Sequence, residues 1–300
     1  MDRLTNMAVF ARVAATGSFS FAARELGISQ ATASKHVQML EGWLGARLLD
    51  RTTRHVALSE VGKTFYAQCN RILEDMEAAR LLGKPDAILH GTVHMAAPVA
   101  FGSTRLGALS VAFMRRNPQL ALHITLVDRA VDVIDEGYDV AMRVAREGSH
   151  GVEEHPGVIV QPLMPMPYVV CAAPSYLASA GTPETPVALA SHACLTDSRH
   201  PGDIWRFVGP EGDYEVAIDG RFRSDNGLLR REATIAGAGI ALLPEALVRD
   251  DLATGRLTLV LPGIAPKATS LQVVYPAARA TLPKVQALLT FLTAELTGPS

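Results

Sequence analysis

Residues 27–45, GISQATASKHVQMLEGWLG, decide the fold of the N-terminal part of the chain. Ser29 can accept a hydrogen bond from a backbone N–H at the start of a helix, and Gly45 is typical of the residue after a helix end. Between them, small and apolar side chains recur at spacings of four, three and four residues, at Ala33, Val37, Leu40 and Leu44. We therefore predict a helix with one buried face between Ser29 and Gly45.

Two helices are predicted before this one. The first covers about residues 3–15 and ends at Gly17. The second is short and is capped by Ser20. Its buried stripe is formed by Ala22, Ala23 and Leu26, and Gly27 ends it. Residues 27–29 then form a tight turn into the helix described above. Two short helices joined in this way are typical of a helix-turn-helix, whose second helix can lie in the major groove of DNA.

The outward face of this second helix carries the groups that DNA reading needs. An amide suits adenine, hydroxyls suit phosphates, and a cation suits guanine or phosphate. The predicted DNA contacts on this face are Ser29, Gln30, Ala31, Thr32, Ser34, Lys35 and Gln38. A solvated helix face carries similar residues, so this face alone leaves both interpretations open.

A basic, hydroxyl-rich turn between two short β-like runs follows in residues 47–59. This pattern predicts a wing, in which Arg54 at the tip can enter a minor groove while Thr52 and Thr53 reach phosphates. The predicted DNA contacts of the wing are Arg51, Thr53 and Arg54. The local charge is positive, as DNA binding requires. Residues 1–66 hold eight Lys and Arg against five Asp and Glu, although the whole chain has a net charge of −2.

A long linker helix is predicted from Ser59 to about Leu82, where residues 83–86 break it. Its apolar positions recur at spacings close to a coiled-coil seam, at Val61, Phe65, Cys69, Ile72, Met76 and Ala79. A helix of this length with an apolar stripe needs a partner. The partner is either the C-terminal part of the same chain or the matching helix of a second subunit, and a two-fold dimer suits a palindromic DNA site.

The C-terminal part of the chain predicts an α/β fold with mostly parallel sheets. Strands at residues 92–97 and 122–127 flank a helical run that ends at Asn117, and a second helix at 131–137 precedes a strand at 139–144. Further strands are predicted near 158–163, 169–173, 193–196 and 272–275, and further helices near 226–238 and 283–296.

Several stretches resemble LysR-type transcriptional regulators. The N-terminal ones, similar to the winged helix-turn-helix of that family, are residues 15–19 (ATGSF), 22–30 (AARELGISQ) and 40–51 (LEGWLGARLLDR). The resemblance continues through residues 128–143, 171–177 and 236–244, and so covers nearly the whole chain. The family often has proline at the position of Ala31 and arginine at that of Lys35. Lysine lacks the planar fork of arginine, so a phosphate contact is the one that survives this change.

The resemblance implies an α/β fold class with an N-terminal winged helix-turn-helix, a long linker helix and a two-lobed effector domain similar to periplasmic binding proteins. The expected domains are 1–58, 59–88 and 91–300, with lobe one formed by 91–162 plus 268–300 and lobe two by 163–267. The implied function is sequence-specific transcriptional regulation on double-stranded DNA, by a homodimer or homotetramer controlled by a small-molecule effector between the lobes.

The effector contacts are predicted from the fold. Ligands of open α/β sheets lie beyond the carboxyl ends of strands, where helix starts offer N–H groups to anions, so a carboxylate is one candidate. Ser103 and Thr104, at the start of the first helix, are either effector contacts or simple helix caps. The full predicted set is Phe101, Gly102, Ser103, Thr104, Arg146, Thr196 and Asn226. Residues 146–151 depart from the family pattern, which affects any contact inferred from that loop.

Other classes of protein find little support in the sequence. Residues 150–155, HGVEEH, fit no metalloprotease spacing, so no metal site is expected. Residues 237–239 lack the third small residue of a dinucleotide fingerprint, and neither a nucleophile elbow nor a phosphate-binding loop occurs, so neither a cofactor nor an enzyme is expected. The alternatives are a stand-alone solute-binding protein, which would need an export signal, and an enzyme on the same scaffold, which would need a catalytic set.

Composition and cysteine usage place the chain among folded cytoplasmic proteins. It is 48% hydrophobic and 19% charged, its N-terminus lacks the features of a signal peptide, and no apolar run approaches the roughly 18 residues of a membrane span. Cys69, Cys171 and Cys194 fit neither a zinc pattern nor a disulfide framework. We interpret them as core thiols, with a redox-sensing pair of Cys171 and Cys194 as the alternative.

Overall fold

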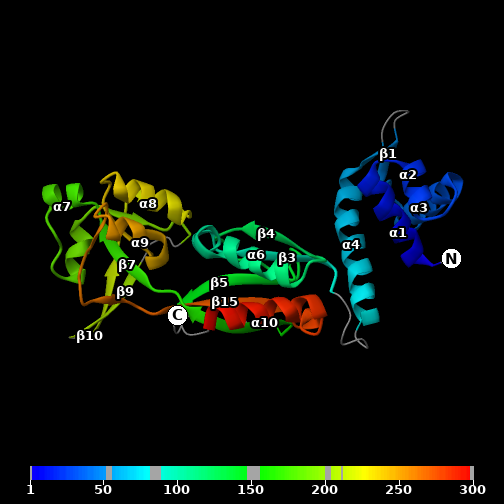
Figure 1. Cartoon of the computed structure of the whole chain (residues 1–300). Helices are drawn as coiled ribbons and strands as arrows, with labels where there is room; N and C mark the ends of the chain where they lie inside the picture. Colours follow the sequence, from blue (N-terminus) through cyan, green and yellow to red (C-terminus); the bar gives the residue numbers. More distant parts are fainter. Residues whose placement is uncertain are drawn as a thin grey trace. The chain divides into compact units, whose positions relative to one another are not determined.

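The computed structural model describes residues 2–51, 56–81, 89–146, 156–199, 204–210 and 212–297. The chain divides into two compact units, Met1–Ala87 and Ile88–Ser300. Figure 1 labels the elements of each unit along the chain. In the described part of the chain, no helix combines the length and the apolar character that crossing a membrane requires.

The first unit consists of three helices, a β-hairpin and a long helix. Its elements are α1 (Arg3–Thr16), α2 (Phe19–Glu25), α3 (Gln30–Leu44), β1 (Leu49–Arg51), β2 (Val56–Leu58) and α4 (Glu60–Leu81). The predicted capping of α3 is confirmed, because Oγ of Ser29 accepts a hydrogen bond from the N–H of Thr32 at 3.1 Å and Gly45 follows the helix.

Two details predicted for α2 were wrong. Its cap is Ser18 rather than Ser20, since Oγ of Ser18 accepts a hydrogen bond from the N–H of Phe21 at 3.3 Å. The helix then ends at Glu25, so Leu26 falls in the turn and is 41% exposed instead of buried.

The apolar stripe of α4 meets two different surroundings. Phe65 and Cys69 pack onto the core of the first unit, where the ring centroids of Phe65 and Phe10 lie 5.8 Å apart. Val61, Ile72 and Met76 are exposed by 52%, 39% and 45%, and the side chain of Ala79 lies outside the description. The first unit therefore covers only part of the predicted seam.

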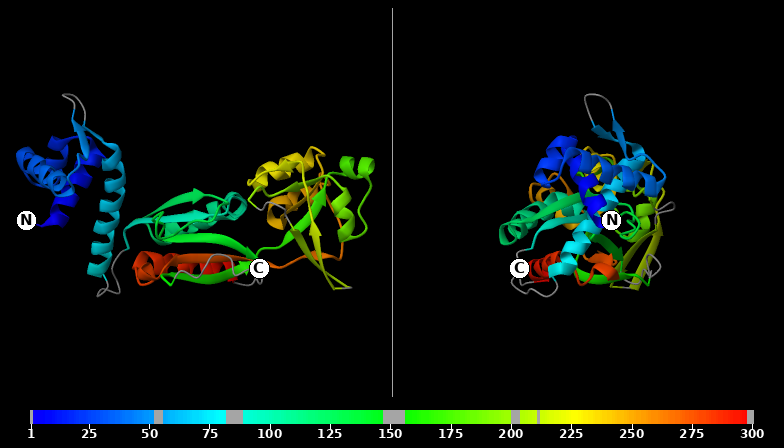
Figure 2. Two further views of the ribbon diagram at one scale, coloured as in Figure 1. Left: turned by 180° about the vertical axis from the view of Figure 1, so that it is seen from behind. Right: turned by 90° about the vertical axis from the view of Figure 1, so that its right-hand side faces the viewer.

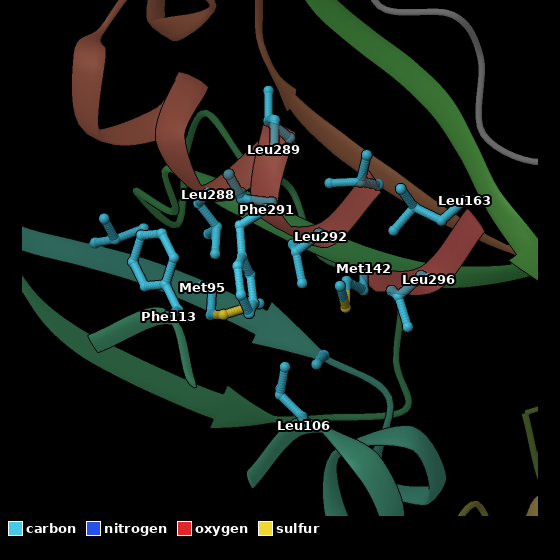
Figure 3. Close-up of a cluster of buried hydrophobic side chains, with 14 of the residues drawn as sticks. Met95, Leu106, Phe113, Met142, Leu163, Leu288, Leu289, Phe291, Leu292 and Leu296 are labelled. Atoms are coloured by element: carbon cyan, nitrogen blue, oxygen red, sulfur yellow. The ribbon is translucent and has the colours of Figure 1, made fainter. Parts of the chain in front are cut away.

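Lobe one of the second unit is a five-stranded sheet with helices packed on it. The strand order is β4-β3-β5-β15-β6, formed by β3 (Gly91–Ala97), β4 (Leu120–Leu126), β5 (Val140–Arg146), β6 (Val158–Pro165) and β15 (Thr269–Pro276). Its helical segments are α5 (Val99–Phe101), the π-helical η1 (Gly102–Leu106), α6 (Gly107–Arg116), η3 (Ala277–Arg279) and α10 (Pro283–Thr297). Figure 3 shows Leu288, Phe291 and Leu292 of α10 directed toward the strands of this sheet, with Phe291 beside Phe113.

Lobe two holds a second five-stranded sheet of order β11-β8-β12-β7-β13 and a small sheet of order β10-β9-β14. The strands are β7 (Tyr168–Ala172), β8 (Cys194–Thr196), β9 (Ile204–Gly209), β10 (Gly212–Ala217), β11 (Phe222–Arg223), β12 (Ile240–Pro244), β13 (Thr258–Leu259) and β14 (Ala265–Pro266). The helices are α7 (Pro174–Ala180), η2 (Pro186–Ser191), α8 (Gly227–Ile235) and α9 (Glu245–Ala253).

The expectation of mostly parallel sheets was wrong. In lobe one, β3 pairs in parallel with β4 and β5, but β15 pairs antiparallel with β5 and β6. The reason is that the chain crosses into lobe two after β6 and comes back as β15, so the returning strand runs in the opposite direction. Figure 2 shows these two connections as green and orange segments between the lobes. The N–H of Met166 donates to the carbonyl of Thr269 at 2.8 Å, which joins them side by side.

The predicted helix at residues 131–137 was also wrong, because this segment forms only a turn. A carboxylate oxygen of Asp132 accepts hydrogen bonds from the N–H groups of Ile134 and Asp135 at 2.8 and 2.9 Å. Gly137 then adopts a φ of 80°, a left-handed conformation that ends the turn before a second one can form. Local side-chain bonding thus replaces a helix in a segment of helical periodicity.

Candidate functional site

The predicted reading face of α3 is exposed. On the opposite face Ala33, Val37 and Leu40 are at most 1% exposed and form part of the core of the first unit. The predicted contacts that lie exposed are Ser29, Gln30, Ala31, Thr32, Lys35 and Gln38, while Ser34 is half-buried. The polar face is therefore available to a partner along most of its length.

Polar contacts fix α3 and its neighbours in place. Nδ1 of His36, on α3, lies 2.6 Å from Oδ1 of the buried Asn6 on α1. Between α1 and α2, the guanidinium of Arg12 donates two hydrogen bonds of 2.5 Å to the carboxylate of Glu25. This guanidinium lowers the pKa of Glu25, so the pair stays charged at neutral pH.

The wing is described only at its base. Strands β1 and β2 pair antiparallel, from Leu49 opposite Leu58 to Arg51 opposite Val56. The predicted contacts Thr53 and Arg54, together with Thr52, lie outside the described residues, as does the side chain of Arg51. Their contacts with DNA stay predictions.

The first group of predicted effector contacts lies in the helix that follows β3. The ring of Phe101 is 2% exposed within the core of lobe one. Ser103 and Thr104 are exposed, and both hydroxyls donate to the carbonyl of Ala100, at 3.3 and 2.7 Å. These residues lie inside the helix with Gly102, in the π-helical segment, so the alternative that they are helix caps was wrong.

The second group lies mostly in lobe two. Thr196 ends β8, is 2% exposed, and its Oγ1 has no hydrogen-bond partner among the described residues. Asn226 caps α8, with Oδ1 accepting from the N–H of Leu229 at 3.0 Å. Arg146 ends β5, and its side chain is outside the description. The motif at residues 150–155 also lies outside it.

A charged cluster between the lobes was missed in the sequence. In lobe two, Asp197 accepts hydrogen bonds from the Nε and N–H of Arg199, at 2.9 and 3.0 Å, and from Arg230 at 3.4 Å. In lobe one, Oδ1 of Asp128 accepts from the N–H of Val99 at 3.0 Å. Burial raises the pKa of Asp128 and the charge of Asp197 adds to this, while the hydrogen bond from Val99 and the charges of Arg199 and Arg230 oppose it. The charges of Asp197, Arg199 and Arg230 in lobe two thus act on Asp128 in lobe one.

Packing at this junction agrees with the electrostatics. Ala100, at the start of the helix in lobe one, packs against a buried cluster of lobe two that includes Leu195 and Leu243. Arg230 is 7% exposed, and its Nε has no hydrogen-bond partner among the described residues. In the sequence, the only indication of this cluster is that a short charged stretch follows each of two predicted strands, one at Asp128 and one at Asp197.

Comparison with known protein families identifies both units. Residues 4–63 match the description "Bacterial regulatory helix-turn-helix protein, lysR family", and residues 87–297 match "LysR substrate binding domain". The chain belongs to the LysR family of transcriptional regulators. This LysR regulator therefore combines a DNA-binding helix-turn-helix with a two-lobed effector-binding domain, as the resemblance implied.

The similarity to curated relatives and to solved structures covers most of the chain of this LysR regulator. It is 34% identical over 264 residues to a probable transcriptional regulator, LtrA, of Klebsiella pneumoniae, which covers 87% of this chain and 84% of that protein. The structure of CrgA from Neisseria meningitidis shares 30% identity at a TM-score of 0.61 and covers 98% of this chain and 99% of that one. AphB of Vibrio cholerae, at 24% identity, a TM-score of 0.60 and coverage of 99% and 100%, shares the fold.

The cysteines of this LysR regulator lie in its cores. Cys69, Cys171 and Cys194 are all buried, and burial raises the pKa of each thiol to about 12. Strand β12 separates Cys171 on β7 from Cys194 on β8, and the two thiols belong to different buried clusters. Two strand spacings amount to about 9–10 Å, beyond the roughly 7 Å limit for Cα atoms joined by a disulfide. The alternative of a redox pair was wrong.

Proposed function

We propose that this regulator reads DNA through α3 and the wing, as a dimer or tetramer, under the control of a small-molecule effector. The domains we assign are residues 1–58 for DNA binding, 59–88 for the linker and 91–300 for the effector. Within the last, lobe one is 91–162 plus 268–300 and lobe two is 163–267. It acts where the DNA is, in the cytoplasm, and it catalyses no reaction.

One observation carries the proposed DNA contacts: α3 has a polar, exposed face directly opposite a buried one. The proposed contacts on this face are Ser29, Gln30, Ala31, Thr32, Ser34, Lys35 and Gln38. Among the described residues Lys35 has no carboxylate partner, which leaves its charge available to a phosphate. Arg51, Thr53 and Arg54 complete the proposal at the wing.

The proposed oligomer forms through α4. Ile72 and Met76 lie one turn apart and are both exposed, at the end of the helix that the first unit leaves uncovered. Full burial of such a side chain from water is favourable by about 1.5–3 kcal/mol, and covering the exposed 39% of Ile72 and 45% of Met76 contributes the corresponding part. A two-fold dimer would place two copies of α3 on the two halves of a palindromic site.

We place the effector at the junction of the lobes. Support comes from Oγ1 of Thr196 and Nε of Arg230, two buried polar atoms that lack a partner in the described part of the chain. A buried donor left unpaired costs about 1–3 kcal/mol, so a ligand that supplies an acceptor would be favoured there. Together with Thr196, the proposed contacts are Phe101, Gly102, Ser103, Thr104, Arg146 and Asn226, and a carboxylate stays one candidate for the ligand.

Selection of genomic DNA fragments by the purified full-length protein tests the proposed DNA contacts. We expect enrichment of an inverted repeat by the wild type, and its loss in Lys35→Ala and in Arg54→Ala. Lys267→Ala is the matched control, because this lysine lies in the second unit next to Asp213 and its substitution removes the same charge. Equal enrichment by all four proteins, or none by the wild type at low salt, would contradict the proposed contacts.

A further inference from the structure

Glu41 joins the reading helix to the wing. It lies in the last turn of α3, and its Oε1 accepts hydrogen bonds from two consecutive backbone N–H groups, those of Leu48 at 2.8 Å and Leu49 at 3.2 Å. Hydrogen bonds to a charged acceptor are about twice as strong as neutral ones. The side chains of Leu48 and Leu49 are buried in the core of the first unit. Leu48 and Leu49 are thus held in place both by their backbone N–H groups and by their side chains.

The start of α4 holds the same segment from its other side. The N–H of Ser59 donates to the carbonyl of Leu48 at 3.0 Å, and the Ser59 hydroxyl donates to the carbonyl of Arg47 at 2.7 Å. Gly62 lies so close that a Cβ there would be 1.9 Å from the carbonyl oxygen of Leu48. The Leu48 residue is therefore bonded through its N–H to α3 and through its C=O to the start of α4.

The wing begins at this anchored point. Leu49 is the first residue of β1 and pairs with Leu58. This first pair sets the register of the pairs that follow it in the hairpin. Glu41 lies six residues after Lys35, or about 9 Å along the helix axis. The acceptor that holds the base of the wing therefore belongs to the same rigid helix as the proposed reading face.

We propose that Glu41 is a positioning residue that sets the wing relative to α3 and thereby determines specificity at the bases flanking the core of the DNA site. Glu41 does not itself contact DNA in this arrangement. It acts through Leu48 and Leu49, whose placement decides where the wing meets the neighbouring minor groove. The inference rests on the DNA contacts proposed above for α3 and the wing.

Selection from a library of randomised DNA sites by the full-length protein tests this role, with Glu41→Gln and Glu41→Ala as a matched pair. Both variants remove the same charge, but only the glutamine keeps an oxygen that can accept from Leu48 and Leu49. We expect Glu41→Gln to keep the wild-type preferences throughout. Glu41→Ala should keep the preference at the core and lose that at the flanking bases by about tenfold, within the range of one base contact.

Glu41→Asp gives a second arm that does not depend on how well the alanine variant folds. It keeps the charge and moves the oxygens back by one methylene, so we expect a partial loss confined to the flanks. Unchanged flanking preference in both Glu41→Ala and Glu41→Asp would overturn the proposal. Equal losses at core and flanks would also overturn it, because they indicate general destabilisation.

Arg54→Ala separates this inference from the proposed function. Loss of flanking preference in Arg54→Ala, with no loss in Glu41→Ala, would reject the role of Glu41 and leave the wing contact standing. Unchanged flanking preference in Arg54→Ala would reject the wing contact itself, and the role of Glu41 with it.

Discussion

The backbone N–H of Val99 donates a hydrogen bond of 3.0 Å to Oδ1 of Asp128. This bond ties the start of the helix after β3 to the chain after β4, at the junction of the lobes. Burial raises the pKa of Asp128 and the charge of Asp197 across the junction raises it further, whereas the hydrogen bond from Val99 and the charges of Arg199 and Arg230 lower it. The junction therefore contains a carboxylate that takes up a proton more readily than an exposed aspartate does.

Asp128→Asn is expected to change how stability depends on pH. Because the pKa is higher in the folded state, the folded protein binds more protons than the unfolded chain above the ordinary value of 3.8. The contribution of Asp128 to stability thus falls as pH rises from there through the folded pKa. Asparagine cannot ionise but can still accept from Val99, so the variant should lack this fall. Thermal unfolding midpoints over a pH series measure it, and parallel profiles of the two proteins would contradict it.

Lys35→Ala is expected to weaken DNA binding and to reduce its dependence on salt. Each phosphate contact that is lost lowers the slope of log affinity against log salt concentration by about one. Binding isotherms at several salt concentrations measure this slope, with Lys267→Ala as the charge-matched control. An unchanged slope in Lys35→Ala would rule out the phosphate contact.

Ile72→Lys is expected to dissociate the oligomer. A lysine in the exposed apolar stripe of α4 would place like charges together across a two-fold interface. The control is Ala67→Lys, since Ala67 is exposed and five residues away, about 140° around the helix. Sedimentation should report a smaller species for Ile72→Lys alone. Identical sedimentation of both variants and the wild type would exclude α4 as the interface.

The three thiols are expected to be unreactive in the native protein. Burial raises the pKa of each to about 12, so the thiolate fraction at neutral pH is very small. A thiol reagent such as dithionitrobenzoate should therefore label none of Cys69, Cys171 and Cys194 until denaturant is added. Rapid labelling of the folded protein, or a disulfide between Cys171 and Cys194 after mild oxidation, would contradict the described packing.

Elements with strong local signals were predictable from the sequence. The helix between Ser29 and Gly45 follows from its cap, its stop and its apolar spacing, all of which lie within a few turns. The shift of the α2 cap from Ser20 to Ser18 was not predictable in this way, since both serines are able caps. The predicted helix at residues 131–137 was wrong for a related reason, because the side chain of Asp132 competes with helical hydrogen bonding.

The candidate site was predictable only in the part that lies within one element of secondary structure. The exposed polar face of α3, on which the proposed DNA contacts lie, follows from helical periodicity alone, since buried and exposed residues recur within one element. The cluster of Asp128, Asp197, Arg199 and Arg230 depends instead on how two sheets meet, and only Asp197 and Arg199 are near neighbours in the chain. Likewise, Asp139 pairs within lobe one with Arg279, 140 residues later in the chain. Nothing in the sequence near either residue indicates its partner.

The position of α10 has a consequence for protein synthesis. Lobe one is completed by β15 and α10, whose side chains fill its core, and both emerge from the ribosome after all of lobe two. The first unit, which carries the helix-turn-helix, is by contrast whole once the first 87 of the 300 residues have been made. A nascent or truncated chain thus carries a finished DNA reader attached to a lobe with an open core. Such a product exposes the apolar surface that proteases and chaperones recognise, which favours its removal before an unregulated DNA reader can accumulate.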